Sequence, residues 1–318
     1  MAVTLAQLRA LVAVHEFEGF AASADEMGVS QSAVSHAITT LEAELEATLV
    51  IRRPAIALTA LGSELLPYAR STLSSADALV ATAARAAGNL TGTVRLAAPS
   101  TVCFGLLPKL LADWQQAFPS ITVSVFEGDD PELVEWLDDG AADAAILVNP
   151  NHVPAGAVTV GEDRYCAVLR DDHPLAAAES VTARDLLDDP ILISGGGCGP
   201  DVTAMFRAED QRFVPAQRVH DNAALLNFVA AGLGVTVFPS IGMGMLAANT
   251  RMVPLAPAKE RKLIFSGPSN RPWSPLVQAL SATSPLLPPN FMKTATNECG
   301  TLPADDEESP YSRLNVAS

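Results

Sequence analysis

The sequence predicts an α-helical N-terminal region, one long helix and a larger α/β region. Residues 1–60 carry apolar side chains at helical spacing, and residues 59–87 contain no glycine after Gly62. From about residue 91 to about residue 290, short apolar runs alternate with amphipathic segments. Such alternation of strands and helices predicts parallel α/β sheets.

Composition narrows the class of protein. The 318 residues carry a net charge of −16, and 49% of them are hydrophobic. This balance excludes a protein that holds nucleic acid mainly through a broad basic surface. It is compatible with a local DNA-reading element, because sequence is read by a few side chains in a groove. The four cysteines are far apart and form no C-x-x-C motif, which excludes a disulfide scaffold and a zinc ribbon.

The sequence also predicts the location of the protein in the cell. No run of 18 residues is free of breakers and polar groups, so we expect no transmembrane helix and no membrane partner. Glu16 and Glu18 stand where a signal peptide would be apolar or small, which predicts a cytoplasmic protein. The five histidines form no pair at metal-ligand spacing, and we expect no metal and no cofactor.

Three short helices are expected at the start of the chain. The third follows the turn at 28–30 and covers residues 31–45, with Ser30 as a suitable N-cap. One face of this helix is apolar, with Val34, Ile38, Leu41 and Leu45. The opposite face presents polar side chains, namely Gln31, Ser32, Ser35, His36 and Thr39.

A short extended element with a basic tip, Arg52-Arg53-Pro54, comes next. The long helix then runs from Thr59 to about Ala87, with a stripe of leucines and alanines that requires a partner helix. The sequence GNLTG at 88–92 ends it and predicts a hinge. Beyond it, expected strands include TVRLAAP, ITVSVFEG and GVTVFP, and VCFGLLPKLLADWQQAF is expected to form one helix. The acidic residues 291–318 are expected to be disordered.

A resemblance to the LysR-type transcriptional regulators covers residues 3–290. Their winged helix-turn-helix is similar to the segment LRALVAVHEFEGFAASADEMGVSQSAVSHAITTLEAELEATLVIRR and the LTALG that follows. Their sensor, which is like a periplasmic binding protein, resembles the segments LLPKLLADWQQAFPSITVSVFEG, DDHPLA, ARDLLDDPILIS and VAAGLGVTVFP.

The resemblance implies a DNA-binding transcriptional regulator rather than an enzyme. Its implied partners are double-stranded DNA, a small-molecule effector, and copies of the chain in a homodimer or homotetramer. The implied segments are a winged helix-turn-helix at 1–58, a linker or dimerisation helix with hinge at 59–90, and an effector-binding domain at 91–290. Within that domain the first lobe would comprise 91–161 and 267–290, and the second lobe 162–266.

The chain departs from the family pattern in the DNA-binding region. Ser32 stands where the family usually has proline, and Glu46 and Val50 replace a usual glycine and phenylalanine. The later part of the recognition helix has His36 and Thr39 where the family often has basic residues. We therefore expect few phosphate contacts and a shallow salt dependence of DNA binding.

The candidate DNA contacts lie on the polar helix face and on the basic tip. Glutamine can form two hydrogen bonds with adenine, and serine reaches bases or phosphates. Without DNA, the same residues are a solvated helix face and surface salt bridges. The candidates are Gln31, Ser32, Ser35, His36 and Thr39 for the groove, and Arg52 and Arg53 for phosphates.

The candidate effector contacts follow expected strands. In open α/β sheets, ligands bind beyond the carboxyl ends of the strands, and helix N-termini there favour a small anion such as a carboxylate. Simple helix capping is the alternative for several of these positions. The candidates are Ser100, Thr101, Asn149, Gly197, Cys198 and His220.

Cys198 allows two further hypotheses. It follows three glycines and precedes an expected helix N-terminus, where the pKa of a thiol is lowered. A redox-sensing regulator is one alternative, and an enzyme with Cys198 as nucleophile and His220 as base is another. A third alternative, suggested by the missing basic residues of the recognition helix rather than by Cys198, is a binding protein that has lost DNA binding.

Overall fold

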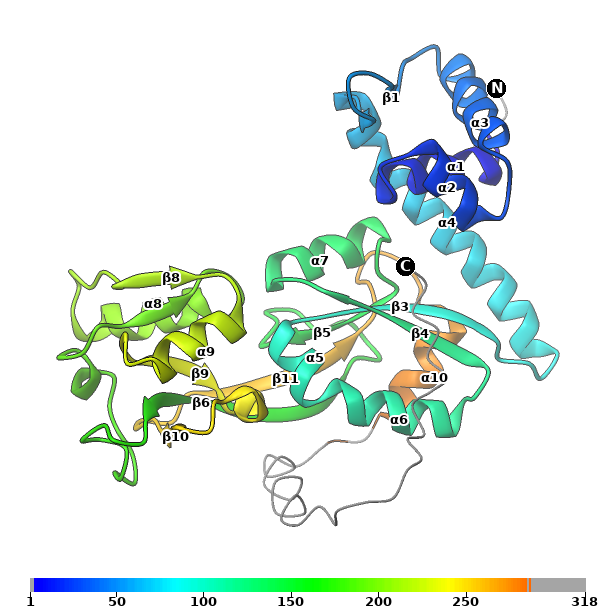
Figure 1. Cartoon of the computed structure of the whole chain (residues 1–318). Coiled ribbons are helices and arrows are strands. Elements are labelled where there is room, and N and C mark those ends of the chain that lie inside the picture. The colour runs from blue at the N-terminus through cyan, green and yellow to red at the C-terminus, as the bar shows by residue number, and fades with distance from the viewer. Residues whose placement is uncertain (1–2, 285, 287–318) are drawn as a thin grey trace, which may run out of the picture.

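The computed structural model describes residues 3–284 and 286, so the expected acidic tail at 291–318 lies outside the described residues. A helical head, one long helix and two α/β lobes follow one another along the chain (Figure 1). The head contains α1 (Leu5–Glu16), α2 (Phe20–Met27) and α3 (Gln31–Glu44), and the long helix is α4 (Ala60–Ala86). No helix in this described part is long and apolar enough to cross a membrane.

Local signals set the helix ends of the head. Thr4 and Gln7 form a capping box at the start of α1. The Ser30 hydroxyl accepts a hydrogen bond from the Ala33 N–H at 3.2 Å, as the sequence predicts for an N-cap. The apolar face of α3 is buried in the core of the head, with Val34 at 1% exposure and Ile38 and Leu41 at 0%.

The extended element after α3 is a two-stranded wing. Strand β1 (Val50–Ile51) pairs antiparallel with β2 (Ala57–Leu58). The Glu42 Oε1 atom accepts hydrogen bonds from the Leu49 and Val50 N–H groups, at 2.8 and 3.1 Å, and so attaches the wing to α3. Glu46, in the loop between them, has a φ of 51°, a left-handed conformation that favours the glycine usual in the family.

Helix α4 begins and ends where the sequence predicts. The Thr59 hydroxyl accepts a hydrogen bond from the Gly62 N–H at 3.0 Å, which caps the helix. Gly62 is needed there, because a Cβ atom at this position would collide with the Leu49 carbonyl oxygen. The helix packs against α1 and continues beside the first lobe (Figure 1).

The two lobes contain nine strands and six α-helices within the described residues. The strands are β3 (Gly92–Ala98), β4 (Ile121–Glu127), β5 (Ala144–Val148), β6 (Val158–Arg170), β7 (Leu192–Ser194), β8 (Gln217–Val219), β9 (Thr236–Pro239), β10 (Thr250–Pro254) and β11 (Glu260–Ser266). The helices are α5 (Ser100–Gly105), α6 (Leu107–Ala117), α7 (Asp130–Asp139), α8 (Gly199–Glu209), α9 (Asn222–Ala230) and α10 (Pro275–Thr283).

The expectation of parallel sheets is correct only in part. Strand β3 pairs parallel with β4 and β5, and β7 pairs parallel with β8. Strands β9, β10 and β11 all pair antiparallel with β6, and β11 also pairs antiparallel with β5. The sheet is therefore mixed, because the chain crosses between the lobes twice, in opposite directions, along β6 and β11.

These crossing strands also move the expected lobe boundaries. The first half of β6 pairs with β11, and its second half, from Tyr165 onward, pairs with β9 and β10 of the second lobe. Residues Leu263–Ser266 pair with β5 of the first lobe. The chain thus re-enters the first lobe within β11, before the expected residue 267.

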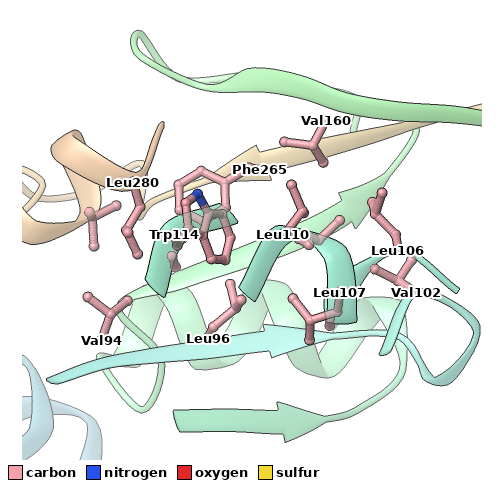
Figure 2. Close-up of a cluster of buried hydrophobic side chains, with 14 of the residues drawn as sticks. Val94, Leu96, Val102, Leu106, Leu107, Leu110, Trp114, Val160, Phe265 and Leu280 are labelled. Atoms are coloured by element: carbon pink, nitrogen blue, oxygen red, sulfur yellow. The ribbon is translucent and has the colours of Figure 1, made fainter. Parts of the chain in front are cut away.

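The core of the first lobe lies between the sheet and helices α6 and α10. Trp114 on α6 meets Phe265 on β11 edge to face, with ring centroids 5.4 Å apart, and Leu110 and Leu280 lie beside them (Figure 2). The expected single helix over 102–118 is divided at Leu106 into α5 and α6. The break follows Gly105, where a Cβ atom would overlap the Ile241 carbonyl oxygen.

Candidate functional site

The polar face of α3 is open to solvent. Gln31, Ser32, His36 and Thr39 are exposed, and Ser35 is half-buried. The Thr39 hydroxyl donates to the Ser35 carbonyl at 2.9 Å, which fixes its orientation on the helix. The structure thus places all five predicted groove contacts on one helix and leaves their side chains accessible.

Arg52 is bound to the recognition helix in the absence of DNA. Its Nη2 atom donates to Thr39 Oγ1 at 2.9 Å and lies 3.5 Å from Glu42 Oε2. Its guanidinium carbon lies 5.4 Å from the centroid of the Phe20 ring. A surface salt bridge is therefore present here, and it holds Arg52 beside the groove-facing residues. Arg53 is exposed at the tip of the wing.

A cavity of about 370 Å³ lies between the two lobes. Of the six predicted effector contacts, Ser100 and Thr101 line it from the first lobe, and Gly197, Cys198 and His220 line it from the second. Its other lining residues are Pro99, Glu127, Asp129, Asp130, Val148, Ser194, Asp221, Asn222, Ala223, Met245 and Arg261.

Asn149 is placed differently from the prediction. It follows β5 with a φ of 45°, and its Oδ1 atom accepts a hydrogen bond from the Lys262 N–H at 2.8 Å. Its own N–H donates to the Lys262 carbonyl at 3.0 Å. The left-handed turn directs Asn149 to the neighbouring strand β11, and it is not part of the cavity lining.

The one arginine of the cavity lining is already paired. Arg261 is 3% exposed, and its Nε and Nη2 atoms donate to the two carboxylate oxygens of Asp163, each at 2.8 Å. Its guanidinium carbon also lies 5.3 Å from the centroid of the Tyr165 ring. The Tyr165 hydroxyl in turn donates to Asp201 Oδ2 at 3.0 Å. This buried pair joins β6 to β11 at the point where both strands cross between the lobes.

Four carboxylates line the cavity, and the sequence analysis did not select them. Glu127 ends β4, Asp129 and Asp130 begin α7, and Asp221 caps α9. Burial raises the pKa of Asp130. The rule that selected Ser100, that ligands gather beyond the ends of parallel strands, applies equally to Glu127 and Asp129 after β4.

The environment of Cys198 opposes the prediction of an activated thiol. Burial raises the pKa of Cys198 to about 12, although the residue precedes the N-terminus of α8. The desolvation of the thiolate therefore outweighs the favourable charge of nearby Arg261 and a backbone hydrogen bond. In the described residues no hydrogen bond joins Cys198 to His220, and no group of three possible ligands could hold a metal ion.

Helix α7 extends from the cavity to the long helix. Asp129 and Asp130 line the cavity at its start, and Asp139 at its end accepts a hydrogen bond from Arg70 Nη1 of α4 at 3.1 Å. Arg70 Nη2 lies 3.3 Å from Glu16 Oε1 at the end of α1. A single arginine thus connects the head, the long helix and the first lobe.

Two family models cover most of the chain. The model described as "Bacterial regulatory helix-turn-helix protein, lysR family" matches residues 5–63, and the "LysR substrate binding domain" model matches residues 87–284. The transcriptional regulator YvbU of Bacillus subtilis is 31% identical over 243 residues, which are 76% of this chain and 83% of that protein.

Two further proteins are similar to this chain over most of their length. A probable hydrogen peroxide-inducible genes activator of Mycobacterium avium is 33% identical over 279 residues, which are 84% of this chain and 89% of that protein. The full-length OxyR structure from Pseudomonas aeruginosa superposes with a TM-score of 0.68 at 22% identity, covering 89% of this chain and 95% of that one, and so shares its fold. Because one family model accounts for the helical head and the other for both lobes, the chain belongs to the LysR family of bacterial transcriptional regulators.

Proposed function

We propose that this regulator binds its operator through the exposed face of α3 and responds to a small effector in the cavity between its lobes. The effector site is supported by one observation, namely that residues of both lobes line a single cavity of about 370 Å³. A ligand held by both walls changes the relative stability of open and closed lobes only as far as its affinity for the two differs.

The groove contacts are Gln31, Ser32, Ser35, His36 and Thr39, with Arg52 and Arg53 on the phosphates. A gel-shift titration with the DNA upstream of a neighbouring gene tests this. Ser35→Ala should weaken specific binding by about 1–3 kcal/mol. Ser180→Ala, an exposed serine of the second lobe, is the matched control and should bind as the wild type does. Equal binding by all three proteins would show that Ser35 makes no contact.

The effector carries a carboxylate or similar anionic group near the start of α8. Gly197 and Cys198 precede this helix and line the cavity, and the positive end of the helix dipole favours negative charge. Ser100 and Thr101 face it from the first lobe, and His220 lies on the same wall as Cys198. Loss of the ligand response in Ser100→Ala, with folding intact, supports this placement, and an unchanged response contradicts it.

Coupling to DNA runs through α7. Its first residues line the cavity, and Asp139 and Gly140 at its other end contact Arg70 and Ser71 of α4. A shift of α7 on ligand binding would therefore move the helix that holds the head. Asp139→Asn should reduce the effect of ligand on operator affinity while leaving ligand binding itself unchanged.

Redox sensing is the second candidate function. Cys198 lies in the cavity wall, and the Mycobacterium avium relative is named as a peroxide-inducible genes activator. The raised pKa of Cys198 opposes this candidate, because thiolates react with peroxide and thiols do not. Titration with hydrogen peroxide decides it: a change in operator binding that disappears in Cys198→Ser favours the redox function.

The regulator works in the cytoplasm as a homodimer or homotetramer held by α4. Leu79 and Val80 are 71% and 65% exposed in the single chain, and Tyr68 is 70% exposed. Large apolar side chains this open on one helix indicate a face that a second copy covers. The mass of the particle by light scattering measures the number of copies.

A further inference from the structure

Arg261 is the only lysine or arginine side chain that lines the cavity in the described part of the chain. It lies on β11 and is 3% exposed, so the protein encloses nearly all of it. A guanidinium carries five N–H donors, and a buried one is costly unless these donors are used. What the donors of Arg261 already bind therefore determines what this wall of the cavity can accept.

Asp163 binds only one side of the guanidinium. Nε and Nη2 of Arg261 donate to the two carboxylate oxygens of Asp163, each at 2.8 Å. Because the guanidinium is planar, this pairing turns Nη1 away from the carboxylate. The guanidinium carbon also lies 5.3 Å from the centroid of the Tyr165 ring, and the Ile241 N–H holds Asp163 Oδ2 at 3.2 Å. The guanidinium is thus held in one orientation by the protein itself.

The Nη1 atom of Arg261 is free and can be reached. No acceptor in residues 3–284 or 286 forms a hydrogen bond or ion pair with it. Over the same residues, the fully buried side-chain nitrogen and oxygen atoms without a partner are Arg70 Nε and Asp130 Oδ1. Nη1 is not one of them, so it keeps some accessible surface. Because the rest of the side chain is enclosed and Arg261 lines the cavity, that surface faces the cavity.

The start of α8 lies close to this guanidinium. Burial raises the pKa of Cys198 to about 12, and the charge of Arg261 opposes that rise, so the two residues are near each other. Cys198 is the N-cap of α8, a helix of 11 residues, and it also lines the cavity. The positive end of the helix dipole and the guanidinium of β11 therefore favour negative charge at one place.

We propose that Arg261 determines which effectors bind, because its Nη1 atom donates a hydrogen bond to the carboxylate of a small monocarboxylic acid. This role rests on the effector site proposed above and names the side chain that holds its anionic group. The ion pair with Asp163 stays intact, since it uses other donors of the same guanidinium. A hydrogen bond between two ions is about twice as strong as one between neutral groups, which gives this contact its weight.

The carboxylates of the wall limit the effector to one negative charge. Glu127, Asp129 and Asp221 are exposed, so solvent screens their repulsion of a carboxylate held at Arg261. A second carboxylate on the same ligand would lie among these groups without a second arginine or lysine in the cavity lining. The rest of the effector is therefore uncharged. A cavity of about 370 Å³ is at the small end of ligand sites, which suits a small acid.

The first experiment compares ligands of equal length that differ in charge. The full-length protein is titrated by calorimetry with butyrate, butyramide and succinate, and with hexanoate, hexanamide and adipate. We expect at least one of the two monocarboxylates to bind. Its amide should bind about tenfold more weakly or less because it lacks the charge, and its dicarboxylate likewise because of the wall carboxylates. Equal affinity for the amide or the dicarboxylate, or no binding of either monocarboxylate, would overturn the proposal.

The variants Arg261→Lys and Arg251→Lys make the second experiment specific. Each replaces an arginine that pairs with an aspartate, but Arg251 pairs with Asp171 and lies outside the cavity lining. Lysine keeps the positive charge beside Asp163 but lacks the planar fork that serves Asp163 and a ligand together. Arg261→Lys should therefore weaken the monocarboxylate by about tenfold or more, and Arg251→Lys should bind it as the wild type does.

Circular dichroism shows whether both variants are folded. Unchanged binding of the monocarboxylate by a folded Arg261→Lys would overturn the proposal. If that variant does not fold, the comparison of acid, amide and dicarboxylate on the wild type still decides. A response that is lost in Ser100→Ala but kept in Arg261→Lys would leave the proposed effector site standing without Arg261 as its anchor. Failure of the wild type to bind operator DNA would instead contradict the proposed function and leave the ligand class unaffected.

Discussion

The carboxylate of Asp129 in the first lobe lies against the backbone of Gly196 in the second, so closely that any side chain at residue 196 would collide with it. The two residues are 67 positions apart in the chain and belong to opposite lobes, where Asp129 lines the cavity and Gly196 precedes the cavity-lining Gly197. Gly196 does not have a positive φ, so its role is the space that it leaves free. The contact therefore brings the start of α7 in the first lobe against the loop that precedes α8 in the second.

Gly196→Ala should destabilise the protein by about 1 kcal/mol at most, because the added methyl group displaces the Asp129 carboxylate, which lies at the end of an exposed side chain and can turn aside. In the background of Asp129→Ala the same change should cost much less, and the difference measures the contact. Chemical denaturation of the wild type, the two single variants and the double variant gives the four free energies of unfolding. Gly161→Ala is the matched control, since its methyl group would meet only ordinary contacts near 3.5 Å. Equal costs of Gly196→Ala in both backgrounds would contradict the contact.

Arg52→Ala should weaken binding to all DNA sequences alike and reduce the slope of log affinity against log salt by about one unit. The reason is that Arg52 is proposed to contact a phosphate from its position beside Thr39. Gel shifts at several salt concentrations measure the slope. Arg212→Ala, which removes an exposed arginine of the second lobe, should leave it unchanged. A lost preference for the operator with an unchanged slope would place Arg52 on a base instead.

Val80→Glu should dissociate the oligomer, because the interface on α4 would bury an unpaired charge. Val80 is 65% exposed in the single chain, so the fold of each copy should survive. Val214→Glu, at a valine that is 80% exposed in the second lobe, is the control. Light scattering gives the particle mass. If both variants keep the wild-type mass, α4 does not hold the copies together at Val80.

The Cys198 thiol should react slowly with iodoacetamide near neutral pH. Its pKa is raised to about 12 by burial, so the thiol stays protonated and the reactive thiolate is scarce below that value. The alkylation rate should rise continuously from about pH 7 to about pH 10, without the plateau that a thiol of ordinary pKa approaches there. Mass spectrometry measures alkylation of the wild type and of Cys198→Ser, and the difference between them gives the rate at Cys198. A plateau below pH 8 would indicate an activated thiol and favour the redox function.

Features determined by neighbouring residues could be predicted from the sequence. Ser30 and Thr59 cap their helices because a hydroxyl at an N-cap needs only the N–H groups of the next turn. The buried face of α3 followed from its period. The helix period predicted the exposed polar face of α3. The ends of the strands predicted the five residues that line the cavity, namely Ser100, Thr101, Gly197, Cys198 and His220.

Features determined by distant residues could not be predicted in the same way. Apolar runs carry no mark of strand direction, so the antiparallel pairing of β6 with three later strands was missed. Asn149 turns to Lys262, 113 positions away, and Arg261 pairs with Asp163, 98 positions away. The pKa of Cys198 depends on how deeply the folded lobes bury it, and the sequence around it shows only the helix N-terminus.

The ten residues of α7, about 15 Å of helix, connect the cavity between the lobes with Arg70, which also contacts the helical head. A genetic selection for strains in which this regulator acts without its signal should therefore yield substitutions far from any ligand. They should occur along 129–140 and at its partner Arg70, whose guanidinium binds both Asp139 and Glu16. Substitutions of the cavity wall alone should mostly abolish the response, whereas those along α7 should fix the regulator in one of its two states.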